Sequence, residues 1–207
     1  MKSKICNVRN TNSIRRRRMM NTLNIDFQKT ALVIIDLQKG IVPIDQSGQV
    51  VPNAKKLVDE FRKHNGFISF VNVAFHDGAD ALKPQTDEPA QGGSGEMPAD
   101  WAEFVPEIGV QDGDYTVTKR QWGAFFGTDL DLQLRRRGID TIVLCGIATN
   151  IGVESTAREA FQLGYQQIFI TDAMSTFSDE EHEATLRFIF PRIGKSRTTE
   201  EFLEQVK

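Results

Sequence analysis

An aspartate and a lysine each stand directly after a short strand-like run. Asp36 follows the apolar run ALVII at residues 31–35, and Lys119 follows YTVT at residues 115–118. A carboxyl group and an ammonium group can form an acid–base site in which each changes the pKa of the other. Two simpler readings stay open: Asp36 can be a turn or helix-cap residue, and Lys119 can be a solvated charge. We expect the neighbouring Arg120 to be solvated.

A third candidate feature is the turn between Gly146 and Gly152, which follows the run TIVLC at residues 141–145. A turn that leads from a strand into a helix exposes backbone N–H groups, which can stabilise a developing oxyanion or hold a carboxylate. Glycine also lets the backbone approach a ligand closely. The same pattern is found in ordinary strand-to-helix turns, so both interpretations remain open.

These features can act together only if the fold brings the ends of their strands to one place. The pattern predicts strands at 31–35, 67–75, 115–118, 141–145, 167–171 and 195–198, and helices at 53–64, 129–137, 151–163 and 179–190. Such alternation predicts a single α/β domain, a Rossmann-like three-layer α/β/α fold with a mainly parallel sheet of about six strands. Sites in such sheets lie at the carboxyl ends of the strands, where all three features would converge.

Residues 76–113 are rich in Gly, Pro and Asp, with the loosest part at residues 91–95. A loop of this length in a compact domain is usually functional or mobile. We expect Trp101 and Phe104 to anchor its end to the body of the domain.

Composition excludes several classes of protein. The chain has 207 residues, 40% of them hydrophobic, which suits one globular domain. No stretch approaches the roughly 20 apolar residues of a membrane span. Two cysteines and three scattered histidines predict neither a disulfide framework nor a metal site, and they favour a cytoplasmic location. We therefore expect no membrane association and no cofactor.

The basic charge is concentrated at the start of the chain. Seven of the 25 basic residues precede Asp26, and the 18 that remain face 28 acidic residues. An acidic body argues against a nucleic acid partner. We predict that residues 1–24 form a disordered basic leader, which is a mis-assigned start, a targeting peptide or an interaction arm, and that residues 25–207 form the domain.

Three segments in order resemble the isochorismatase-like hydrolases, also called the cysteine hydrolase family. They are ALVIIDLQ at 31–38, KRQWGAFFGTDL at 119–130 and CGIATNIGVESTAREA at 145–160, continued by LGY at 163–165 and TDA at 171–173. The order and spacing match from about residue 27 to residue 191. The resemblance implies a small-molecule substrate, a homodimer or homotetramer, and a cis peptide bond between Ile147 and Ala148.

The usual catalytic residues of that family are Asp, Lys and Cys. By resemblance Asp36 and Lys119 are the first two, but Gly152 occupies the place of the cysteine. Cys145 lies seven residues earlier, inside a predicted strand, and is interpreted as a buried apolar residue. Without a thiolate there is no covalent route to amide hydrolysis, which speaks against nicotinamidase, N-carbamoylsarcosine amidase and ureidoacrylate hydrolase activities. The metal-binding motif of nicotinamidases is missing as well, because His76 stands alone.

True isochorismatases also carry glycine at this position and hydrolyse a vinyl ether. In that reading Asp36 protonates the vinyl carbon, water attacks the resulting oxocarbenium ion, and pyruvate leaves. This requires a raised Asp36 pKa, against which a charged Lys119 would work. Two alternatives are a hydrolase that uses water on another small substrate and a small-molecule binding protein on a former enzyme scaffold. By resemblance we expect five residues to contact the substrate: Gln38, Trp122, Ile147, Ala148 and Asn150.

Overall fold

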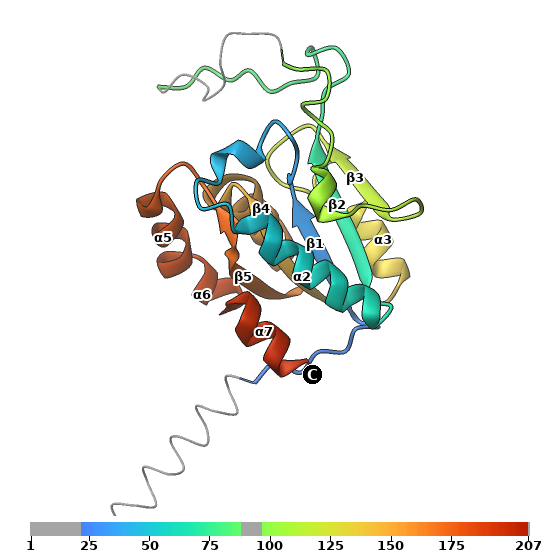
Figure 1. Cartoon of the computed structure of the whole chain (residues 1–207). Helices are drawn as coiled ribbons and strands as arrows, with labels where there is room; N and C mark the ends of the chain where they lie inside the picture. Colours follow the sequence, from blue (N-terminus) through green and yellow to red (C-terminus); the bar gives the residue numbers. More distant parts are fainter. Residues whose placement is uncertain (1–21, 88–96, 207) are drawn as a thin grey trace, which may run out of the picture.

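Six strands form one parallel sheet in the order β3-β2-β1-β4-β5-β6 (Figure 1). The computed structural model describes residues 22–87 and 97–206. The strands are β1 (Thr30–Ile35), β2 (Phe67–Val73), β3 (Tyr115–Lys119), β4 (Thr141–Ile147), β5 (Gln166–Ser175) and β6 (Lys195–Arg197). The predicted α/β fold with a parallel sheet is thereby confirmed.

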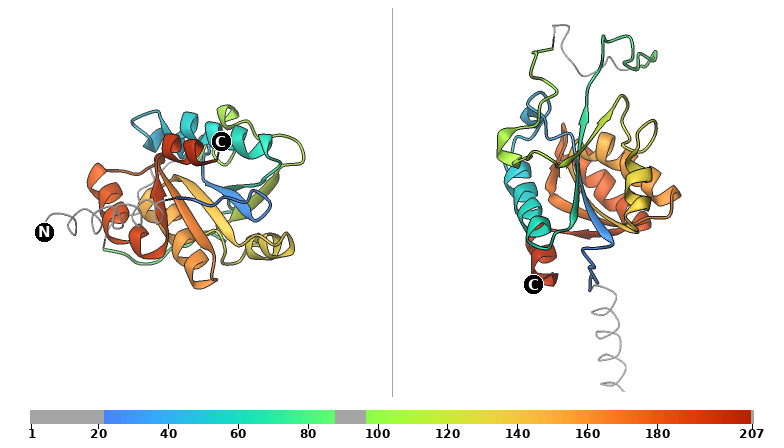
Figure 2. Two further views of the ribbon diagram at one scale, coloured as in Figure 1. Left: turned by 90° about the horizontal axis from the view of Figure 1, so that it is seen from below. Right: turned by 90° about the vertical axis from the view of Figure 1, so that its right-hand side faces the viewer.

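Helices cover both faces of the sheet. Figure 2 shows α2 and α7 on one face and α3 and α4 on the other. The helices are α2 (Val50–Lys63), α3 (Leu130–Arg136), α4 (Glu154–Gln162), α5 (Asp179–Phe188), α6 (Phe190–Ile193) and α7 (Thr199–Gln205), with the short turns η1 (Val42–Ile44), η2 (Pro106–Ile108) and η3 (Thr149–Val153).

The central strand β1 is buried on both faces. Leu32 and Ile34 belong to the core that includes α2 and α7, whereas Val33 and Ile35 belong to the core that includes α3 and α4. Successive side chains of a strand point to opposite faces, so a central parallel strand needs an unbroken apolar run. Burying each Leu or Ile fully stabilises the fold by roughly 1.5–3 kcal/mol. Asp36 therefore follows one of the most firmly held segments of the chain.

The start of α2 and the continuity of the last predicted helix differ from the sequence prediction. α2 begins at Val50, three residues before the predicted start at residue 53, because the Asp45 carboxylate accepts a hydrogen bond from the Val50 amide at 3.0 Å. The predicted helix 179–190 is divided into α5 and α6. Pro191 lies in the first turn of α6, a position that tolerates proline, whereas a continuous helix would not.

The terminal helix α7 was not expected from the sequence. Its start is a capping box: Thr198 Oγ1 accepts from the Glu201 amide at 3.2 Å, and Glu201 Oε2 accepts from the Thr198 amide at 2.9 Å. The motif T-x-x-E was visible in the sequence and could have predicted this helix. Phe202 of α7 is fully buried.

The folded body begins earlier than residue 25. Leu23, placed in the leader by the sequence prediction, is 4% exposed, and its amide donates to Gln205 Oε1 at 2.7 Å. Burial of this apolar side chain packs Leu23 against the core, so the described fold includes a residue that the prediction assigned to the leader. Residues 1–21 lie outside the described part of the chain, and the leader stays a prediction. Across the described residues, no helix has the length and apolar character of a membrane span.

The long connection between β2 and β3 is anchored beside β1, as predicted. The Lys39 amide donates to the Glu103 carbonyl at 2.8 Å, and the Gly40 amide donates to the Trp101 carbonyl at 3.1 Å. Phe104 packs edge-on against a core phenylalanine, with ring centroids 5.9 Å apart. The predicted loosest part, residues 91–95, lies outside the described residues. The anchored part brings Trp101 to the carboxyl ends of the strands.

Candidate active site

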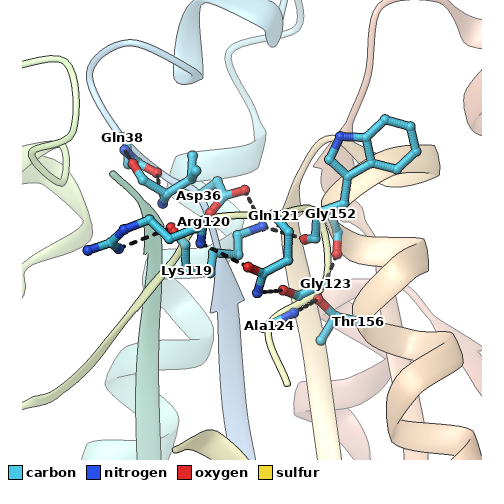
Figure 3. Close-up of polar contacts among 11 residues, drawn as sticks. Asp36, Gln38, Lys119, Arg120, Gln121, Gly123, Ala124, Gly152 and Thr156 are labelled. Carbon is cyan, nitrogen blue, oxygen red and sulfur yellow. Dashed lines mark hydrogen bonds and ion pairs between the residues drawn. The ribbon is translucent and has the colours of Figure 1, made fainter. Parts of the chain in front are cut away.

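Asp36 and Lys119 form a buried ion pair at the carboxyl edge of the sheet (Figure 3). Lys119 Nζ lies 2.7 Å from Asp36 Oδ2, and the two side chains are 1% and 7% exposed. They come from strands that are not neighbours, because β2 lies between β1 and β3. The long lysine side chain bridges this gap. The structure thus brings together the two residues that the sequence singled out.

The backbone at Asp36 is held in an unusual conformation. Its φ is 54°, in the left-handed region that aspartate tolerates better than most residues. Gln38 supports this turn: its Nε2 donates to the Val73 carbonyl at 2.9 Å, and its Oε1 accepts from the Val73 amide at 2.8 Å. The Gln38 side chain thus makes the two hydrogen bonds to Val73 that a residue of a neighbouring strand would make at the end of β2.

Gln38 was expected to contact substrate, and the structure does not place it there. Its side chain is fully buried, and both polar atoms of its amide are used by the backbone of Val73. Gln38 is also not among the residues that line the cavity, so its amide does not face a ligand there. Gln38 positions Asp36.

Burial controls the protonation of Asp36. Removal from water raises the pKa of this carboxyl from 3.8 to about 6, although the charge and hydrogen bond of Lys119 oppose the rise. Asp36 Oδ1 is buried and has no hydrogen-bond partner among the described residues. Asp36 can therefore carry a proton near neutral pH, as a general acid must.

Gly152 lies directly beside this pair. A Cβ atom at residue 152 would lie 3.1 Å from Asp36 Oδ2 and 3.1 Å from Lys119 Nζ. The position where a nucleophile would stand thus faces both charged groups and carries no side chain. Cys145 does not replace it, because it is fully buried in β4 and burial raises the pKa of its thiol.

Gly152 lies in η3, which the sequence predicted as the first turn of an ordinary helix. Instead the amides of Ile151 and Val153 both donate to the Ala148 carbonyl, at 3.2 and 3.1 Å, and the regular helix α4 starts only at Glu154. The bond from Val153 spans five residues, which makes η3 a π-helical turn, a feature frequent at functional sites. The peptide bond between Ile147 and Ala148 is cis, as predicted.

A cavity of about 940 Å³ opens above the ion pair. Asp36, Lys119 and Gly152 line it, together with the predicted contact residues Trp122, Ile147 and Ala148. Four apolar side chains that are well exposed also line it: Leu82, Met97, Trp122 and Phe177 are 68%, 53%, 62% and 38% exposed. The cavity therefore combines a polar, buried acid–base pair with an apolar rim.

Asn150, the fifth predicted contact residue, is not among the residues that line the cavity. Its Oδ1 accepts from Thr176 Oγ1 at 2.6 Å, and its Nδ2 donates to Glu181 Oε1 at 3.3 Å. η3 therefore directs this side chain toward the end of β5 and the start of α5, and not toward the ion pair.

Two basic residues at the cavity were not expected from the sequence. Arg120, predicted to be a solvated charge, lines the cavity together with Lys83, and its Nε donates to Asp80 at 2.8 Å. Its position directly after Lys119 at a strand end was the only signal in the sequence. Asp80 lies 40 residues away, and no spacing rule connects the two. In the described parts of the chain, no three His, Cys, Asp or Glu side chains are grouped to hold a metal ion.

Comparison with known proteins identifies the family to which this chain belongs. Residues 30–201 match the isochorismatase domain, which covers most of the chain. The chain belongs to the isochorismatase family. Members of this family are hydrolases, so the protein is an isochorismatase-family hydrolase.

Similar proteins of this family include one of unknown activity and one named for amide hydrolysis. The uncharacterized isochorismatase family protein YecD of Escherichia coli O157:H7 is 47% identical over 186 residues, covering 87% of this chain and 98% of YecD. The ureidoacrylate amidohydrolase RutB of Acinetobacter baylyi is 31% identical, covering 89% of this chain and 75% of RutB. A solved isochorismatase-family structure from Burkholderia thailandensis is 46% identical with a TM-score of 0.82, covering 90% of this chain and 98% of its own.

Proposed function

We propose that this isochorismatase-family hydrolase cleaves an enol-pyruvyl ether without a covalent intermediate, with Asp36 as the proton donor. The observation that carries the proposal is a buried carboxyl with a pKa of about 6 beside a glycine. A neutral carboxylic acid near pH 6 can transfer a proton to carbon, and Asp36 and Gly152 both line the cavity that would hold the reacting group.

The reaction consumes one water molecule. The Asp36 carboxyl gives its proton to the terminal vinyl carbon, and the ether carbon becomes an oxocarbenium ion. Water adds to that carbon and loses a proton, which returns to the Asp36 carboxylate. The resulting hemiketal then breaks its C–O bond while its hydroxyl proton passes to the leaving oxygen, which releases an alcohol and pyruvate. The Lys119 ammonium, 2.7 Å from Asp36, stabilises the Asp36 carboxylate until the carboxylate accepts that proton.

The relative RutB is named for amide hydrolysis, and the same chemistry by a thiol is not supported here. A thiol route needs a nucleophile that attacks the carbonyl carbon. Position 152 holds glycine, and Cys145 is buried inside the sheet. Water attack on another small substrate would instead need Asp36 as an ionised base. The two roles of Asp36 demand opposite protonation states, so pH separates them.

The pH dependence of turnover tests the proposal. If Asp36 is the acid, kcat for an enol-pyruvyl ether falls as the pH rises above about 6, by about tenfold per pH unit, because only the protonated form reacts. Pyruvate release from isochorismate and from simpler enol-pyruvyl ethers between pH 4.5 and pH 8 provides the measurement. Activity that increases through pH 6 would assign Asp36 as a base, and a lack of any ether turnover would reject the proposal.

The cavity wall favours a substrate with a carboxylate. Lys83, Lys119 and Arg120 line it, and Asp36 is the one acidic side chain among its described lining residues. An enol-pyruvyl group carries a carboxylate next to the ether carbon. Arg120 can hold such a group, since a guanidinium suits the two oxygens of a carboxylate.

Arg120→Gln is expected to raise KM for the ether by roughly 10-fold to 100-fold, because a hydrogen bond to a charged group contributes about 1.5–3 kcal/mol. We expect kcat to change much less, because Arg120 binds the substrate and does not transfer a proton. Steady-state kinetics checks both constants. Arg158→Gln is the matched control: Arg158 forms a half-exposed ion pair with Glu154 at 2.9 Å and does not line the cavity. An equal rise of KM in both variants would contradict the role of Arg120.

We also propose that the enzyme is cytoplasmic and homo-oligomeric. The first point rests on the few cysteines, of which Cys145 is buried and free. The second rests on the family resemblance.

A further inference from the structure

A single buried hydroxyl joins the Gly152 turn to the loop that follows Lys119. Thr156 on α4 is fully buried. Its Oγ1 donates to the Gly152 carbonyl at 2.7 Å and accepts from the Ala124 amide at 3.1 Å (Figure 3). Threonine in a helix commonly bonds the carbonyl four residues earlier. The second bond, to a loop 32 residues away, is specific to this fold.

Within residues 22–87 and 97–206, that loop supplies the only acceptor for the Lys119 ammonium apart from Asp36. Lys119 Nζ donates to the Trp122 carbonyl at 2.6 Å, and Trp122 lies two residues before Ala124. The loop touches α4 at a second point, where Glu159 Oε2 accepts from the Phe125 amide at 2.9 Å. A side chain at Gly123 would collide with the Glu159 carboxylate, so the loop lies directly against α4.

We propose that Thr156 is a positioning residue that holds the Lys119 ammonium against Asp36, acting through the Trp122 carbonyl. The inference rests on the proposed function for its effect on turnover. The same hydroxyl also donates to the carbonyl of Gly152, so it joins the turn that contains Gly152 to the loop that holds Lys119. Charged groups around this network are Asp36 after β1, Lys119 and Arg120 at the end of β3, and Glu159 on α4.

Loss of the Thr156 hydroxyl should leave the Lys119 ammonium less firmly positioned beside Asp36. In Thr156→Val the shape of the side chain is kept, but the Ala124 amide and the Gly152 carbonyl each lose a partner. The Trp122 carbonyl is then less firmly held, and Lys119 spends time farther from Asp36. Because Lys119 opposes the rise of the Asp36 pKa, a more distant ammonium lets that pKa rise further.

The test is a ¹³C NMR titration of the Asp36 carboxyl, assigned by comparison with Asp36→Asn. We expect Asp36 in Thr156→Val to titrate at a higher pH than in the wild type, and kcat for the enol ether to fall by roughly tenfold or more through misplacement of the pair. Thr156→Ser retains the hydroxyl and should restore both properties. An Asp36 pKa that is unchanged or lowered in Thr156→Val overturns the proposal.

Thr185→Val is the matched control. Thr185 is 3% exposed, and its hydroxyl donates to Glu154 Oε2 of the same helix α4 at 2.7 Å, with no bond to the loop after Lys119. A merely structural role for Thr156 predicts that both valine variants lower stability and leave the Asp36 titration alone. If Thr156→Val does not fold, Glu159→Gln weakens the second anchor, and a raised Asp36 pKa is again expected.

This titration needs no substrate, so two failures can be told apart. Absence of ether turnover in the wild type rejects the proposed function. A normal Asp36 titration in the variants rejects the positioning role of Thr156.

Discussion

Asp36→Asn is expected to lower kcat for enol-ether hydrolysis by roughly 10²-fold to 10⁴-fold, the range that a positioned general acid contributes. The amide keeps the size of the side chain and can still accept a hydrogen bond from Lys119. It has no acidic proton to give to carbon. Pyruvate release under saturating substrate measures the effect. Asp131→Asn on α3, where the carboxylate pairs with Arg135 at 3.2 Å outside the cavity, is the control and should keep its activity.

Asp36→Asn should also change how the free energy of unfolding depends on pH. The folded state raises the Asp36 pKa from 3.8 to about 6, so folding favours the protonated carboxyl. The corresponding stabilisation is complete below pH 3.8 and is lost as the pH rises to about 6. Urea unfolding at a series of pH values should show this decrease in the wild type and a smaller one in Asp36→Asn. Identical pH profiles for the two proteins would show that burial does not perturb Asp36.

Gly146→Ala is expected to destabilise the fold by roughly 2–6 kcal/mol, the sum of a strained backbone and an overpacked contact. Gly146 has φ 124°, and its position in β4 is opposite Ile35 of β1. A Cβ atom there would collide with the Ile35 carbonyl, which is backbone and cannot rotate away. Ile35 directly precedes Asp36, so relief of the clash would displace the catalytic carboxyl. Urea unfolding and kcat should both be affected.

Gly164→Ala separates the effect of backbone strain from the effect of the overpacked contact. Gly164 also has a positive φ, of 87°, but a Cβ atom at this position meets no atom within 4 Å. Only backbone strain applies, and we expect a cost of roughly 1–3 kcal/mol with kcat unchanged. Equal losses of stability in the two variants would show that the close approach between β4 and β1 is not the constraint.

The sequence by itself determined the features that depend on neighbouring residues. The run ALVII predicts a buried strand through its own apolar side chains, and β1 was found there. Asp36 and Lys119 were identified because each follows a strand-like run, and Gly152 was identified because the resemblance to a known family places a cysteine there. The parallel sheet then required their strand ends to meet, since alternating strands and helices permit few other arrangements.

Contacts between distant segments decided the rest. Burial by the whole domain, and not the Asp36 motif, sets the pKa of that carboxyl near 6. Gln38 is held inside the fold because its amide bonds the backbone of Val73, 35 residues away in sequence. Arg120 lines the cavity and donates to Asp80, 40 residues away in sequence. Local sequence specifies which groups are available. Exclusion of water and pairing across the sheet depend on residues far apart in the chain, so only the tertiary structure assigns the charge state and the partners of those groups.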